Sequence, residues 1–186
     1  MPNAQQNQSQ SNQKASPANQ DNSGKVGFGN DKAKPIAEKN AMLDQEKFIR
    51  KLYTYGEGDQ MNVEKFVSMF SDEGYMLDMA SGTKFRGKAI GDSIAALARA
   101  FPDLHRELLN IYVAENVVVA EIALRGTHKG ELALVSGTLA PTGKKIVDVP
   151  MCDVFHLEGG KIISFDCYNL PSVMLRQLGE KNMRLS

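Results

Sequence analysis

The chain has 186 residues, of which 22 are lysine or arginine and 22 are aspartate or glutamate, so its formal net charge is zero. It shows no basic stripe, which argues against nucleic acid and membrane surfaces as partners. No apolar stretch approaches the ~20 residues that a membrane-spanning helix needs. We therefore expect a soluble, cytoplasmic protein with neither nucleic acid nor membrane among its partners.

The first forty residues differ in composition from the rest of the chain. Ten of the first twenty are Gln or Asn, and only three large apolar residues follow Met1 within this segment. Such a segment buries too little apolar surface to offset the entropy that ordering costs. It also lacks the apolar run of a secretory signal. We predict a disordered polar tail at residues 1–40, which is either dispensable or a docking arm, one domain at 41–180 and a short tail at 181–186.

Apolar residues recur at helical spacing three times in the first half of the folded part. The first helix is predicted over residues 44–56, with Asp44 as its N-cap. A second helix follows Asn62, another N-cap residue. A third covers residues 88–100 and ends before Pro102. Two short strands are predicted between the second and third helices, at residues 75–79 and 83–86.

The period of the apolar residues changes to two after residue 104, which is typical of strands. A turn at Pro141-Thr-Gly143 and another at Gly159-Gly160 separate the later runs. Residues 129–135 give no clear pattern, and a short helix or turn closes the domain at 171–178. The strands are predicted at residues 105–113, 117–127, 144–157 and 162–168.

This order of elements predicts the fold class. Helices gather in the first half and hairpin-linked strands in the second, which indicates an α+β domain rather than alternating βαβ units. A curved antiparallel sheet with the N-terminal helices packed across it would enclose a pocket. About 140 residues suffice for one such domain with its own core.

The last hairpin carries the first chemical hypothesis. Gly159-Gly160 is a strong two-residue turn signal, and counting outward from it places Asp153 opposite Asp166. Side chains directly opposite each other lie roughly 5 Å apart at Cβ. Two carboxyl groups that close repel each other as anions, so at least one pKa is expected to rise. A carboxyl group with a raised pKa is suited to general acid/base chemistry.

The same count places Cys152 opposite Cys167. A cross-strand disulfide is geometrically possible, but nothing in the sequence indicates export to an oxidising compartment. We interpret the two thiols as small core residues. Their spacing matches no metal site, and three scattered histidines do not complete one, so no metal and no cofactor are expected.

The ordered motifs of residues 44–179 resemble the SnoaL-like polyketide cyclases of the nuclear transport factor 2-like superfamily. No single motif is specific, and the set in this order carries the resemblance. The motifs are Gly56-Glu-Gly-Asp59, Phe101-Pro-Asp-Leu104, Arg125-Gly-Thr-His-Lys-Gly130, Ala140-Pro-Thr-Gly143, Asp153-Val-Phe155, Gly160-Lys-Ile-Ile163, Phe165-Asp166 and Arg176-Gln-Leu-Gly179.

The resemblance implies a cone-shaped domain, usually a homodimer, with a cavity that opens at one end of the cone. It also implies cofactor-free acid/base chemistry, such as intramolecular aldol cyclisation, in which an aspartate late in the last strand is the acid/base. Asp166 matches that position. The chain departs from the family where it has Ser164-Phe165-Asp166, because many members have His-Trp-Asp there, so a common histidine partner is missing.

Four residues are therefore candidates for catalysis. Asp166 is the expected acid/base, and Asp153 would share its proton or hold it protonated. His128, at the end of a strand, could relay protons at a cavity mouth. Tyr168, two residues from Asp166, could donate a hydrogen bond to an enolate. Each also has a purely structural interpretation: a strand-end carboxylate, an outward or ion-paired Asp153, a solvent-exposed histidine and an amphipathic core tyrosine.

The sequence thus predicts a SnoaL-like enzyme of the aldol cyclase, isomerase or dehydratase type. Its ligand would be a small apolar, carbonyl-containing or polyketide-like molecule. The alternative is a non-catalytic ligand-binding or dimerisation module of the same fold. A third possibility is an interaction protein whose arm docks a partner.

Overall fold

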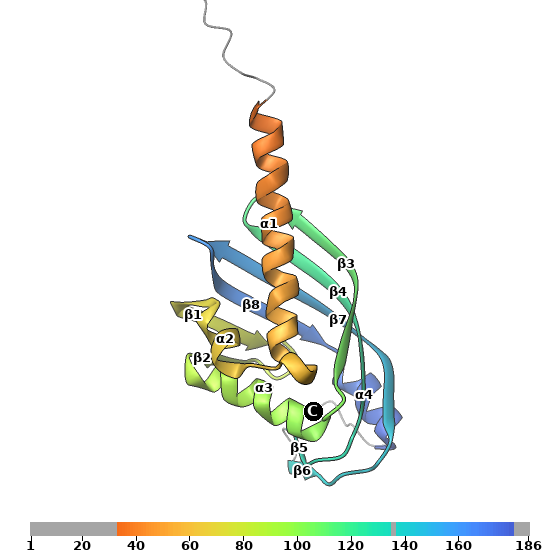
Figure 1. Ribbon diagram of the computed structural model, residues 1–186. Helices are drawn as coiled ribbons and strands as arrows, with labels where there is room; N and C mark the ends of the chain where they lie inside the picture. The colour runs from red at the N-terminus through yellow and green to blue at the C-terminus, as the bar shows by residue number, and fades with distance from the viewer. Residues whose placement is uncertain (1–32, 135–136, 181–186) are drawn as a thin grey trace, which may run out of the picture.

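The structure, a computed structural model, describes residues 33–134 and 137–180. A curved six-stranded sheet carries α1, α2 and α3 on one face, and α4 packs near the lower end of the sheet (Figure 1). The elements are α1 (Ala33–Gly56), η1 (Gly58–Gln60), α2 (Val63–Ser68), β1 (Phe70–Asp78), β2 (Thr83–Arg86), α3 (Lys88–Ala100), β3 (His105–Ala114), β4 (Val117–Thr127), β5 (Leu132–Leu134), β6 (Gly137–Leu139), β7 (Lys145–Glu158), β8 (Lys161–Asn169) and α4 (Pro171–Leu178).

Helix α1 begins eleven residues earlier than predicted. The sequence indicated a start at Asp44, but the helix starts at Ala33, so residues 33–40 of the segment predicted to be disordered are helical. Residues 1–32 lie outside the described part of the chain. The first half of α1 projects beyond the sheet (Figure 1), and its residues 36–44 are exposed, whereas Ile49 and Leu52 in the second half are fully buried. Within the described ranges, no helix is long and apolar enough to cross a bilayer.

Helices α2 and α3 follow the sequence prediction closely. The side chain of Asn62 caps α2 by accepting a hydrogen bond from the Lys65 backbone amide. Helix α3 occupies the predicted residues 88–100 and packs against α2 at Gly91. A side chain at this glycine would lie 2.5 Å from Cγ1 of Val63, so the two helices approach this closely only because position 91 has no Cβ.

The six-stranded sheet has the order β2-β1-β8-β7-β4-β3. Four of the five strand pairs are antiparallel, as predicted, but β1 runs parallel to β8, so the sheet is mixed. The sequence pattern reveals hairpins between neighbouring strands, but the direction of a pairing between distant segments leaves no local signal. The unclear segment after residue 129 forms a separate two-stranded sheet of β5 and β6.

A bulge in β8 changes the predicted register of the last hairpin. Leu157 pairs with Ile162 as expected, but His156 pairs with Ser164, so Ile163 is an extra residue in β8. From His156 to Met151, each residue of β7 therefore pairs with the β8 residue that follows the one predicted. Because side chains alternate between the faces of a strand, a shift of one residue moves each side chain of β8 to the opposite face.

The core consists of two apolar clusters. The larger one fills the space between the concave face of the sheet and the helices, and the smaller one lies at the lower end around Phe101, Ile146 and α4. Helix α4 is fixed to β7 there, because the Gln177 side chain pairs with both backbone groups of Val147. Asp153, on β7, is one of the few buried charged or polar residues of the described part of the chain, and it is 1% exposed.

Replacing Gly91 with alanine tests the contact between α2 and α3. Alanine favours helix by about 1 kcal/mol over glycine, but overpacking a tight contact costs roughly 1–3 kcal/mol. We expect Gly91→Ala to lower the free energy of unfolding, measured with urea. The double variant with Val63→Ala should recover part of that loss, and purely additive effects would contradict the proposed contact.

Candidate functional site

Asp153 is the chemically most unusual group of the described residues. It lies on β7, faces the concave side of the sheet and accepts a hydrogen bond of 2.8 Å at Oδ2 from the hydroxyl of Tyr53 on α1. Its other oxygen, Oδ1, is buried and has no hydrogen-bond partner among residues 33–134 and 137–180. A buried carboxylate normally has its oxygens satisfied, so half of this group is open to a further partner.

Burial raises the pKa of Asp153 to about 6. The hydrogen bond from Tyr53, the positive charge of Arg106 and the neighbouring thiol of Cys167 act in the opposite direction and lower it. Desolvation dominates because the apolar core stabilises the charged form poorly. A carboxyl group with a pKa near 6 exchanges its proton readily near neutral pH, which is the property that a general acid/base requires.

Tyr53 is held rigidly beside this carboxyl group. Its ring packs edge-to-face against Phe155, with 6.1 Å between the ring centroids and 83° between the planes. Burial, followed by the negative charge of Asp153, raises the pKa of Tyr53 well above its ordinary value. The phenol therefore stays protonated and remains a hydrogen-bond donor to Asp153.

Cys167 lies directly opposite Asp153 on β8 and faces the same side of the sheet. Burial, together with the negative charge of Asp153, raises the pKa of its thiol well above the ordinary value. Cys152 pairs with Tyr168 instead and faces the other side, and both cysteines are free. The predicted placement of Cys152 directly opposite Cys167 is therefore wrong, and the bulge at Ile163 is the reason.

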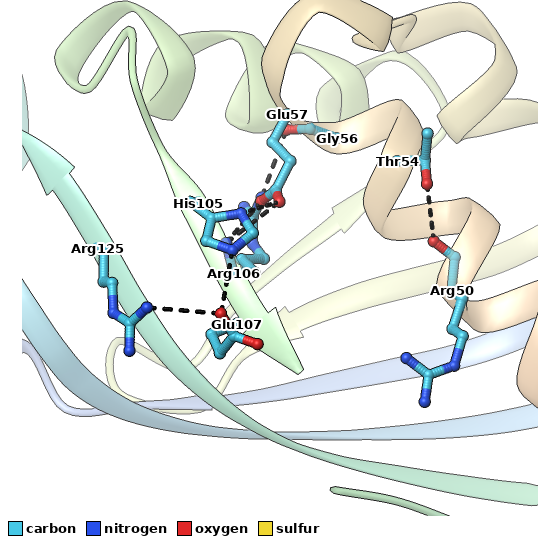
Figure 2. Close-up of polar contacts among 8 residues, drawn as sticks. All are labelled: Arg50, Thr54, Gly56, Glu57, His105, Arg106, Glu107 and Arg125. Atoms are coloured by element: carbon cyan, nitrogen blue, oxygen red, sulfur yellow. Dashed lines mark hydrogen bonds and ion pairs between the residues drawn. The ribbon is translucent and has the colours of Figure 1, made fainter. Parts of the chain in front are cut away.

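A surface cleft of about 340 Å³ lies between α1 and β3, and one of its lining residues is Tyr53, the hydrogen-bond donor to Asp153. Figure 2 shows its polar residues at the end of α1 and the start of β3. Two of the lining residues are the ones that act on Asp153: Tyr53 through its hydroxyl and Arg106 through its charge. The lining residues are Arg50, Tyr53, Thr54, Glu57, His105, Arg106, Glu107 and Leu108.

An ion pair between Glu57 and Arg106 forms part of the cleft wall. Nη1 of Arg106 lies 3.0 Å from Oε2 of Glu57, and the backbone amide of Arg106 donates to the same carboxylate at 3.0 Å. The side chain of Glu57 is 13% exposed and that of Arg106 is 7% exposed. This pair fixes the end of α1 to the start of β3 (Figure 2).

Further charged groups extend from this pair toward the solvent. The imidazole of His105 lies 3.2 Å from Glu57 through Nδ1 and 3.4 Å from Glu107 through Nε2. Arg125 on β4 contacts Glu107 at 3.5 Å and Asp148 at 2.6 Å. These groups are all about half exposed, apart from Glu57, so each of their contacts is weak.

The structure does not bring Asp166 to Asp153. Asp166 pairs with Val154, whereas Asp153 pairs with Cys167, so the two carboxyl groups lie on opposite faces of the sheet. The predicted pair of facing aspartates is therefore wrong, because the bulge shifts β8 by one residue. Asp166 is half-buried and, within the described part of the chain, its Oδ1 has no hydrogen-bond partner. Tyr168 is 46% exposed on the same face as Asp166.

His128 also lies away from Asp153, in the lower cluster against Phe101, with 5.2 Å between the ring centroids. It is fully buried rather than exposed at a strand end. The Thr142 amide donates to its Nδ1 at 3.2 Å, and burial lowers its pKa. A neutral ring that accepts a bond from Thr142 holds the 140–144 turn against the end of β4.

A second, larger cleft of about 690 Å³ lies beside α2 and β1. Its lysine, Lys161, donates to the backbone carbonyl of Ser68 at 2.5 Å and so caps the end of α2. This cleft gathers no buried titratable group. Nor do residues 33–134 and 137–180 contain any cluster of three His, Cys, Asp or Glu side chains that could hold a metal ion.

Sequence reasoning missed three of the residues around Asp153. Tyr53 was one of five tyrosines without a distinguishing feature, and Glu57 appeared only within the Gly56-Glu-Gly-Asp59 motif. Arg106 offered the clearest available signal. It lies two residues before Leu108 in a predicted strand and therefore shares the inward face with this apolar residue. A charged residue at an inward position needs a partner, and the search for one would have led to an acidic residue.

The pH dependence of stability tests the burial of Asp153. In the unfolded chain its pKa is about 3.9, so between pH 4 and 6 the folded protein keeps a proton that the unfolded chain releases. Stability should therefore fall as the pH rises through this window, by up to about 3 kcal/mol. We expect urea unfolding of Asp153→Asn to lose this part of the slope, while Asp72→Asn, at an exposed position, keeps it. Equal slopes in all three proteins would contradict the burial of an ionisable group.

Comparison with known proteins identifies the family. The model of the SnoaL-like domain matches residues 49–165, a span that contains Tyr53, Glu57, Arg106 and Asp153 and ends one residue before Asp166. No curated protein matches the sequence.

Several solved structures share the fold. A candidate SnoaL-like polyketide cyclase from Jannaschia sp. aligns with a TM-score of 0.65 and 20% identity over 76% of this chain and 95% of that one. A protein of ketosteroid isomerase-like fold from Catenulispora acidiphila, in complex with trimethylamine, aligns with a TM-score of 0.59 and 21% identity over 72% of this chain and 93% of that one. IdmH from Streptomyces antibioticus, a candidate polyketide cyclase, aligns with a TM-score of 0.60 and 19% identity over 72% of this chain and 97% of that one. With its family model matched over most of the domain and its curved sheet and helices shared with these structures, the chain belongs to the SnoaL-like domain family.

Proposed function

We propose that the protein is a cofactor-free acid/base enzyme that acts on a small carbonyl-containing molecule, by aldol cyclisation, isomerisation or dehydration. Asp153 would be the general acid/base. The observation that carries this proposal is a carboxyl group that is 1% exposed, has a pKa raised to about 6 and has a free Oδ1 within the described structure.

The chemistry follows from the two oxygens of Asp153. Oδ2 is held by Tyr53, so the orientation of the carboxylate is fixed. Oδ1 would take a proton from the carbon next to a substrate carbonyl and return it to another atom of the same molecule. All three reaction types use such a transfer, and each needs a base whose pKa lies near the working pH. Proton abstraction and return by one carboxyl group leaves the enzyme unchanged after each turnover.

Asp166 is the alternative base within this proposal, with Tyr168 beside it on the other face of the sheet. Its free Oδ1 supports such a role, but its half-buried position gives it a wetter environment than that of Asp153. His128 would act only through the turn that it holds, since its ring contacts Phe101 and Thr142.

The second candidate function is a non-catalytic binding or dimerisation module. The packing around Asp153 favours it, because Phe155 and Ile49 of the same cluster are fully buried and the cleft at α1 and β3 does not include Asp153 among its lining residues. We further propose a cytoplasmic homodimer. The exposed tyrosines Tyr112 and Tyr168, on the face of the sheet opposite Asp153, support self-association, which sedimentation of the full chain would measure.

Deuterium uptake by small ketones distinguishes an enzyme from a binding module. We expect the protein to accelerate exchange of the protons next to the carbonyl of cyclohexanone and 2-tetralone in D₂O, followed by proton NMR. Asp153→Asn should lower the rate roughly 100-fold or more, the range of general acid/base effects. Asp166→Asn is the matched control and should retain the rate. Loss of exchange in Asp166→Asn alone would move the base to the other face of the sheet, and no exchange by the wild-type chain would favour the binding module.

A further inference from the structure

The buried Asp153 raises a question of access. A molecule that reacts at Oδ1 must pass the wall that separates this atom from the solvent. The nearby cleft between α1 and β3 shares two of its lining residues, Tyr53 and Arg106, with the surroundings of Asp153. Tyr53, which both lines the cleft and bonds to Asp153, lies between the cleft and the carboxyl group, and Arg106 belongs to the same cleft wall.

The two parts of this wall differ in how firmly they are held. Tyr53 is a core residue whose ring packs on Phe155 and whose hydroxyl is bonded to Asp153, so moving it would disrupt the core. The guanidinium of Arg106 is held by Glu57 at 3.0 Å and by a longer contact of 3.4 Å with the Gly56 carbonyl. Arg106 is thus the movable part of the wall, and Glu57 holds it in place.

Charge decides what can release Arg106. A guanidinium that is 7% exposed is stable only when an anion pairs with it, because an unpaired buried charge is strongly destabilising. A molecule that displaces Glu57 must therefore bring an anionic oxygen of its own. The planar guanidinium matches a carboxylate with two parallel hydrogen bonds.

We propose that the α1–β3 cleft is a binding site for a small carbonyl compound that carries a carboxylate, and that Arg106 binds this carboxylate in exchange for Glu57. The carbonyl end of the bound molecule would then extend past Tyr53 toward Asp153. The cleft volume of about 340 Å³ is near the lower end of the usual range for ligand sites, about 300–1,000 Å³, so the ligand is a short keto acid or a small ring rather than a polycyclic compound. The role of the carbonyl end rests on the function proposed above, but the carboxylate site does not.

The test uses levulinate, a stable keto acid, and 2-pentanone, which has a similar chain without the carboxylate. Each is titrated at pH 7 into the full-length ¹⁵N-labelled protein while the Nε–H signal of Arg106, assigned with Arg106→Lys, is followed by NMR. We expect levulinate to shift this signal and 2-pentanone to leave it unchanged. Arg106→Gln, which removes the charge, should bind levulinate at least tenfold more weakly than the wild type.

Glu57→Gln provides the decisive variant, because it removes the competing anion and leaves Arg106 in place. Levulinate should bind this variant roughly tenfold more tightly than the wild type. Glu158→Gln is the matched control, since Glu158 is exposed at the end of β7 and does not line this cleft, and its affinity should equal that of the wild type. If Glu57→Gln unfolds on its own, levulinate should raise its melting temperature more than it raises that of Glu158→Gln.

The outcomes separate this inference from the proposed enzymatic function. Equal or weaker binding of levulinate by Glu57→Gln, equal shifts with 2-pentanone, or no shift of the Arg106 signal in any variant would overturn the carboxylate site. Asp153→Asn should still bind levulinate through Arg106. A protein that binds levulinate in this way but exchanges no ketone protons would keep the site and lose the enzyme.

Discussion

The desolvation of Asp153 is the constraint on which the site depends. Moving a carboxyl group from water into an apolar core disfavours its charged form, and the core cluster around β7 leaves this group 1% exposed. The hydrogen bond from Tyr53, the nearby charge of Arg106 and the thiol of Cys167 offset only part of the effect, so the pKa lies at about 6. The protein thus keeps near neutrality a group that costs stability when ionised. A cost of this kind is typical of functional sites.

The ion pair of Glu57 and Arg106 links this buried group to the surface. It lines the α1–β3 cleft and joins the end of α1 to the start of β3. The positive charge of Arg106 also lowers the pKa of Asp153 and that of Tyr53. Truncating Arg106 would therefore alter three properties together: the attachment of α1, the cleft wall and the proton affinity of Asp153. Variants of Glu57 leave the guanidinium in place. Changes in ligand affinity are therefore easier to assign to the cleft in these variants than in variants of Arg106.

Much of the fold could be predicted from the sequence, because local signals are strong where an element caps or turns on its own residues. The N-cap Asn62, the helix of residues 88–100 and the Gly159-Gly160 turn are examples. The site was harder to predict. A single extra residue, Ile163, moves Asp166 to the opposite face of the sheet, and a bulge leaves no composition signal in a run of β-branched residues. The partners of Asp153 come from α1 and β3, about 100 and 50 residues away, and only tertiary packing brings them together.

Direct titration of Asp153 tests the central claim most simply. The carboxyl ¹³C signal of Asp153, assigned by its absence in Asp153→Asn, should titrate with a midpoint near 6. In Tyr53→Phe, the midpoint should rise further, because the hydrogen bond that favours the ionised form is lost. A midpoint near the ordinary value of about 4 in both proteins would mean that water reaches the carboxyl group, and it would contradict the account of a desolvated acid/base.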